Sequence, residues 1–94
     1  MGKMNEISLW LKHYLRYRIG IRRLDRKARK KDKNEGYQNR NNDIYVKYCD
    51  IMTDVIYLID LSVKDFKNKD LKGSTEALVW VNGYIRQASK LLDE

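Results

Sequence analysis

The apolar residues of this chain recur at steps of three and four through three long segments, and no proline interrupts any of them. This spacing returns side chains to one face of an α-helix, which has 3.6 residues per turn. Sandwiches and barrels usually carry prolines and glycines in their turns, whereas this chain has no proline and only five glycines. The pattern therefore predicts an all-α fold built from a few long helices.

The first segment predicts a helix over about residues 5–33. Asn5 is a candidate N-cap, and Glu6 would then lie in the first turn. Gly20 falls inside the pattern at a cost of about 1 kcal/mol relative to alanine, which indicates either close approach of another helix or a bend. The apolar seam consists of Ile7, Trp10, Tyr14, Tyr17, Ile21, Leu24 and Ala28.

Two further helices are predicted over about residues 43–67 and 74–92, the latter capped by Ser74. The 43–67 segment has so wide an apolar face that we expect it to be the central helix, covered on two sides. The polar stretch at 34–42 is the clearest loop. Together these features predict one domain over residues 1–94. It would be a three-helix bundle or a long antiparallel helical hairpin with a third packed helix, and a homodimer formed through an exposed seam is compatible with it.

Positive charge is concentrated at the end of the first segment. Residues 12–40 hold twelve Lys or Arg against three acidic side chains, a net charge of +9, while residues 41–94 carry −2. The second half therefore lacks the acid to neutralise the first. The densest part of the cluster comprises Arg22, Arg23, Arg26, Lys27, Arg29, Lys30, Lys31 and Lys33.

A basic helix of this kind favours binding to a polyanion, and contacts to phosphates release counterions. We predict a small non-enzymatic regulatory protein that contacts nucleic acid through this helix and the following loop. The loop contributes Arg40, and Tyr37 is a candidate for stacking on an unpaired base, although a simple loop tyrosine is the alternative. The predicted binding residues are Arg22, Arg23, Arg26, Lys27, Arg29, Lys30, Lys31 and Arg40.

Two other interpretations of the cluster stay open at this point. It could be a solvated helix face without a partner. It could also dock on an acidic protein surface, as in a small phage- or mobile-element-type inhibitor or immunity protein that covers a larger partner's acidic or nucleic-acid-binding surface. Membrane binding is disfavoured because the basic segment after Leu24 has almost no apolar face to insert.

The remaining chemistry-bearing residues do not form a catalytic pattern. His13 is the single histidine and lies off the seam, and Cys49 is expected to be a small buried hydrophobe. Asp60 lies away from the polar stripe of its segment and is expected to pair with Arg18 or Arg86. No metal-ligand spacing, phosphate-binding glycine loop or nucleophile elbow is present, so we expect no metal, no cofactor and no enzyme activity. A single cysteine and the absence of a signal-like segment favour a cytoplasmic protein.

Overall fold

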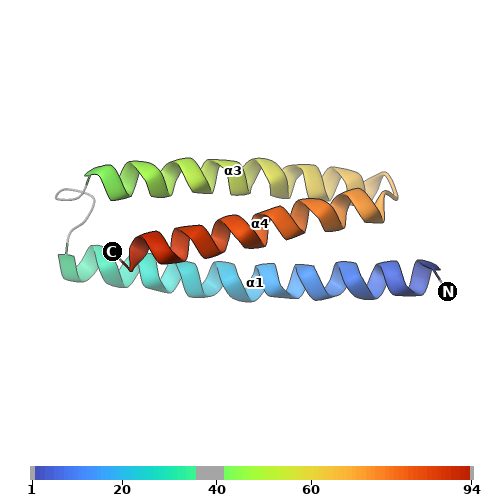
Figure 1. Ribbon diagram of the computed structural model, residues 1–94, viewed down its shortest axis with the longest axis horizontal. Helices are drawn as coiled ribbons and strands as arrows, with labels where there is room; N and C mark the ends of the chain where they lie inside the picture. The colour runs from blue at the N-terminus through green and yellow to red at the C-terminus, as the bar shows by residue number, and fades with distance from the viewer. Residues whose placement is uncertain (1, 36–41, 94) are drawn as a thin grey trace.

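The computed structural model describes residues 2–35 and 42–93, which form a bundle of three helices (Figure 1). These are α1 (Gly2–Glu35), α3 (Asn42–Lys67) and α4 (Leu71–Leu92), and the described residues contain no strand. At 1.5 Å per residue α1 is about 51 Å long, close to the 52 Å longest extent of the molecule. The predicted three-helix bundle is confirmed.

The helices run up, down and up, and α4 lies between α1 and α3 (Figure 1). Helices α1 and α4 are parallel, because Trp10 contacts Ser74 near their beginnings and Lys27 contacts Ser89 near their ends. The expectation that the 43–67 segment would be central is therefore wrong. Helix α4 packs closely against both neighbours, whereas the backbones of α1 and α3 stay farther apart.

Small side chains explain why α4 takes the central position. Its buried residues include Ser74, Ala77 and Ala88, which allow neighbouring helices to approach closely on two sides. The wide apolar face of α3 is instead partly open to solvent, with Ile56 61% and Tyr57 68% exposed. The breadth of an apolar face thus misidentified the central helix.

A single apolar cluster joins the three helices. Its buried members are Leu24, Val55, Val81, Ile85, Ala88 and Leu92. The α1 seam is half-buried or buried from Trp10 to Ala28, as predicted, while Ile7 at its start is 50% exposed. Gly20 serves close approach, since a Cβ there would lie 3.3 Å from Cγ2 of Ile85 on α4.

Aromatic rings occupy the wider side of the bundle between α1 and α3. The Trp10 ring of α1 lies 4.7 Å, centroid to centroid, from the Phe66 ring of α3. It also stacks on Tyr14 at 5.0 Å, and Tyr14 in turn contacts Tyr17 at 6.1 Å. Aromatic side chains are large, so the Trp10 and Phe66 rings can meet across the wider separation between α1 and α3.

The turn between α3 and α4 is short and well hydrogen-bonded. The amide of Asp70 donates to the Asp65 carbonyl (2.8 Å) and that of Lys69 to the Phe66 carbonyl (3.0 Å), the pattern of a Schellman motif. Lys69 takes the left-handed position with φ of 64°. The Asp70 side chain caps α4 by accepting from the Gly73 amide at 3.0 Å.

Two predicted helix caps are therefore wrong. Helix α4 begins at Leu71 because Asp70 supplies the cap, and Ser74 lies inside the helix, where it is fully buried. Helix α1 begins at Gly2, so Asn5 and Glu6 also lie inside a helix rather than at its start. A capping residue followed by an acidic residue is a local signal, and it occurs within helices as well as at their ends.

Candidate nucleic-acid interface

Four of the predicted binding residues form a continuous exposed surface on α1. Arg22, Arg26 and Lys30 follow one another at steps of four, and Arg23 lies beside them. All four are exposed, and none forms an ion pair with a carboxylate of the described residues. We call Arg22, Arg23, Arg26 and Lys30 the basic face.

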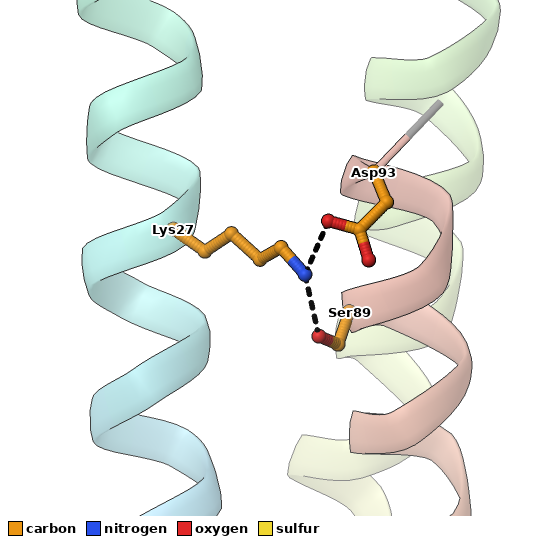
Figure 2. A network of polar contacts seen from close by, with 3 residues as sticks. All are labelled: Lys27, Ser89 and Asp93. Atoms are coloured by element: carbon orange, nitrogen blue, oxygen red, sulfur yellow. Dashed lines mark hydrogen bonds and ion pairs between the residues drawn. The ribbon is translucent and has the colours of Figure 1, made fainter.

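Lys27 does not belong to the basic face, because its side chain turns toward α4 (Figure 2). Its Nζ donates to Ser89 Oγ at 3.0 Å and pairs with an Asp93 carboxylate oxygen at 2.5 Å. Lys31 is only 8% exposed and is engaged in an interaction of its own. Both were predicted to contact a partner, and the structure instead places Lys27 in a contact with α4 and buries Lys31, while their partner contacts stay predictions.

The other predicted residues have mixed outcomes. The Arg29 side chain is 81% exposed and pairs with Asp25 at 3.2 Å, one turn earlier on α1. Exposed pairs at this spacing contribute about 0.5 kcal/mol or less, so this pair leaves the guanidinium accessible to a stronger anion. Arg40 and Tyr37 lie outside the described residues, and their predicted contacts stay predictions.

A groove between α1 and α4 adds arginines that the sequence did not bring together. It has a volume of about 440 Å³, and Arg16 and Arg23 of α1 line it together with Arg86 of α4. We call it the arginine groove. Gly20 and Ile85, the pair at the closest approach of the two helices, are also part of its lining. Arg23 belongs to both the groove and the basic face, so the two surfaces are continuous.

Hydrogen bonds fix the register of α1 on α4 and thereby position the groove. The Trp10 indole donates to Ser74 Oγ at 2.8 Å, and the buried Ser62 hydroxyl of α3 lies 2.8 Å from the same oxygen. At the groove itself, the side-chain amide of Asn82, which is part of the lining, donates to the His13 carbonyl at 3.1 Å. Buried and half-buried polar groups cost free energy when they are unpaired, so these bonds disfavour other registers.

The environment of His13 follows from this interface. The pKa of its imidazole lies below the ordinary value of 6.5, first because of desolvation and then because of the nearby positive charges of Arg16 and Lys12. The imidazole is therefore biased toward its neutral form.

Several other expectations from the sequence are wrong. Cys49 is exposed rather than buried. Asp60 is also exposed and forms no ion pair within residues 2–35 and 42–93, and Arg86 faces the arginine groove instead.

In the described part of the chain, no three His, Cys, Asp or Glu side chains come together as metal ligands would.

Large apolar side chains also reach the surface. On α1, Leu11, Leu15 and Ile19 follow at steps of four and are 46%, 50% and 53% exposed. Trp80 of α4 is 62% exposed, and its ring lies 6.4 Å from that of Tyr84. Contiguous exposed apolar side chains are typical of surfaces that bind other macromolecules.

Sequence reasoning missed Arg16 and Arg86 as candidate site residues. A partial signal existed in α1, where Arg16 and Arg23 are seven residues apart and flank Gly20 on one face. No comparable signal marked Arg86, which lies 63 residues beyond Arg23 in the chain. Only the packing of α4 beside α1 brings it to the groove.

Across residues 2–35 and 42–93, no helix combines the length and the apolarity that crossing a membrane requires. Comparison of this chain with protein-family models, with curated proteins and with solved structures finds no significant match.

Proposed function

We propose that this protein is a non-enzymatic binding protein that contacts the phosphate backbone of nucleic acid through the basic face of α1. The observation that supports the proposal is the exposure of Arg22, Arg23, Arg26 and Lys30 without ion-pair partners among the described carboxylates. Cations held in this way on one rigid helix present a regular array of charge to a polyanion.

The helix surface favours recognition of charge and shape over recognition of base sequence. Each phosphate neutralised by Lys or Arg releases counterions, so affinity falls with salt by about 0.9 log units per log unit of salt for each contact on B-DNA. Contacts of this type position a protein on nucleic acid, whereas specificity requires contacts to base edges. We therefore expect strong salt dependence and weak sequence preference.

The test measures fluorescence anisotropy of labelled duplex DNA, single-stranded DNA and RNA at about 50 mM and about 200 mM salt. The variant replaces Arg22, Arg26 and Lys30 with glutamine, which removes three exposed cations from the basic face. We expect its salt slope to fall by about 3, one for each lost contact. A protein that binds none of the three nucleic acids at the lower salt would refute the proposal.

A matched control separates a local interface from net charge. Lys47, Lys64 and Lys67 are exposed on α3, and their replacement with glutamine removes the same number of charges. We expect this control to keep most of the affinity. Equal losses in both triple variants would show that overall charge, rather than the basic face, attracts the nucleic acid.

The second candidate function is a protein-binding module. The exposed apolar residues favour it, especially the Leu11–Leu15–Ile19 row and Trp80. In this alternative the apolar residues would form the centre of the interface, and the arginines would supply a charged rim complementary to an acidic partner. The same surface could also bring two copies of this chain together.

The two candidates give different results after nuclease treatment. A protein partner would be retained by the wild-type chain after nucleic acid is digested and lost by a variant with Leu11→Gln and Leu15→Gln. Sedimentation velocity of the purified protein would reveal a homodimer by its mass, and the same variant should then become monomeric. Unchanged retention and unchanged mass in the variant would exclude the apolar row as an interface.

A further inference from the structure

We infer that the arginine groove is a binding site for backbone phosphates of the bound nucleic acid, with Arg16, Arg23 and Arg86 as the contacting residues. This inference rests on the proposed function and extends it, because it adds α4 to an interface that the basic face places on α1 alone. The starting observation is convergence: three arginines from two helices line one groove of about 440 Å³.

Charge in the groove is uncompensated by its own lining. Every ionisable side chain that lines it is an arginine, and none of the described lining residues is acidic. Arg16, Arg23 and Arg86 are exposed and form no ion pair with the described carboxylates. An anion entering the groove would therefore meet three cations without displacing an existing partner.

One acidic group at the end of α4, beyond the groove, is paired with a lysine. Asp93 follows the last turn of α4, beyond the lining residue Ser89, and its carboxylate is held by Lys27 (Figure 2). Lys27 also donates to Ser89, so one lysine satisfies both groups. Lys27 thereby offsets the negative charge of Asp93, which follows the lining residue Ser89 by four positions in the chain.

The chemistry of the cations favours phosphate. Guanidinium groups offer paired N–H donors that match two phosphate oxygens, while an ammonium group acts as a point charge. The three cations of the groove are all arginine, in contrast to the mixed arginine and lysine of the basic face. Their geometry therefore suits bidentate phosphate contacts better than diffuse attraction.

Spacing and continuity favour a chain of phosphates over a single small anion. Arg16 and Arg23 are two turns apart, about 10 Å along the axis at 1.5 Å per residue, so the groove has room for more than one phosphate. Arg23 is shared with the basic face, so a strand lying on that face can continue directly into the groove. A polynucleotide backbone fits this layout.

The test compares two double variants, each of which removes two positive charges, in the anisotropy assay over a salt series. Arg16→Gln with Arg86→Gln removes two groove cations, and Lys72→Gln with Lys90→Gln removes two exposed cations of α4 outside the groove lining. We expect the groove pair to lower the salt slope by about 2 and the affinity by on the order of tenfold. The lysine pair should change affinity by no more than about twofold, as expected when charge is removed without loss of a phosphate contact.

A charge-conserving change isolates the bidentate contact. Arg16→Lys with Arg86→Lys keeps the net charge but removes the planar donor pair, so we expect a clear loss of affinity. Arg18→Lys, at an exposed α1 position outside the groove lining, should bind as the wild type does. A loss with glutamine but none with lysine would refute the bidentate contact and leave only a charge effect.

The outcomes separate this inference from the proposed function. If the wild-type protein binds and the groove pair equals the lysine pair, the groove inference is refuted while the basic face stands. If the wild-type protein binds no nucleic acid at low salt, both are refuted. Circular dichroism melting of each variant checks folding, and exposed positions should leave the unfolding midpoint nearly unchanged.

Discussion

The two interfaces of α4 differ in kind. Toward α3, the hydrogen-bonded contact of the buried Ser62 with Ser74 lies at one end of α4, near the short turn that connects the two helices. Toward α1, it uses polar contacts spread along the helix, namely Trp10 to Ser74, Asn82 to His13 and Lys27 to Ser89 and Asp93. The arginine groove runs beside the second interface only.

This difference shows how one small bundle can combine stability with a charged surface. Apolar packing alone would hold α1 on α4 without fixing how far it slides, whereas directional hydrogen bonds specify the register. Register decides whether Arg16 and Arg23 of α1 meet Arg86 of α4 at one groove. The polar contacts between α1 and α4 therefore determine the geometry of the proposed binding surface, and the apolar core shared by all three helices supports it.

The largest expected effect tests the apolar part that both interfaces share. Leu24 of α1 is 2% exposed in the core cluster, so Leu24→Ala should lower the free energy of unfolding by about 2–5 kcal/mol. Urea denaturation followed by circular dichroism measures this loss. Ile56→Ala, at a side chain that is 61% exposed, is the control and should stay within about 0.5 kcal/mol of the wild type. Similar losses in the two variants would contradict the assignment of the core.

The second effect tests the point where the two interfaces meet. Ser74→Ala leaves the Trp10 indole N–H without its acceptor, so we expect a loss of about 1–3 kcal/mol in the free energy of unfolding. Ser89→Ala should cost less, because Lys27 keeps Asp93 and can turn to water. Chemical denaturation of both variants measures the two losses in the free energy of unfolding. Equal losses would show that the hydrogen bonds of Ser74 contribute no more to stability than the contact between Lys27 and Ser89.

A stabilising substitution tests the backbone conformation of the α3–α4 turn. Lys69 has φ of 64°, a conformation that glycine adopts without steric cost, so Lys69→Gly should raise the free energy of unfolding by about 0.5–1 kcal/mol. Lys64→Gly, at an exposed position inside α3, should lower it by about 1 kcal/mol. Thermal melts would show shifts of opposite sign. A destabilised Lys69→Gly variant would mean that the lysine side chain contributes more than its backbone strain costs.

The smallest effect concerns pH and the α1–α4 interface. Because the pKa of His13 is lowered in the folded protein, the unfolded chain binds more protons just below pH 6.5, and stability rises with pH there. Denaturation midpoints should therefore increase slightly from about pH 5.5 to about pH 7.5, where carboxylates titrate little. His13→Gln should flatten this trend, since the chain has one histidine. A steeper trend in the variant would contradict the assignment.

The sequence was sufficient for the fold class and for most of the α1 seam. Steps of three and four place side chains on one face whatever the partner helix is, so Trp10, Tyr14 and Leu24 were correctly predicted to face inward. The central helix was predicted wrongly because apolar breadth was used as the criterion. Residues such as Ala77 and Ala88 of α4 bury little area, yet their small size decides which helix can have two close neighbours.

The candidate site was predictable only where it depends on a single helix. Arg22, Arg26 and Lys30 share a face by their spacing, and the structure keeps them exposed. Lys27 belongs to the same dense cluster but turns inward, because its side chain contacts Ser89 and Asp93 of a segment that is distant in the sequence. Contacts between segments far apart in sequence depend on packing, which local spacing does not encode.

The parallel pairing of α1 with α4 has a consequence for how the chain folds. Its hydrogen bonds join residues 62 to 69 positions apart, whereas α3 and α4 are adjacent segments. Closing a long loop costs more entropy and slows formation of the contacts that depend on it. The α3–α4 hairpin should therefore form first and α1 should dock last. In native-state hydrogen exchange, amides of α1 should accordingly open together and exchange sooner than those of α4.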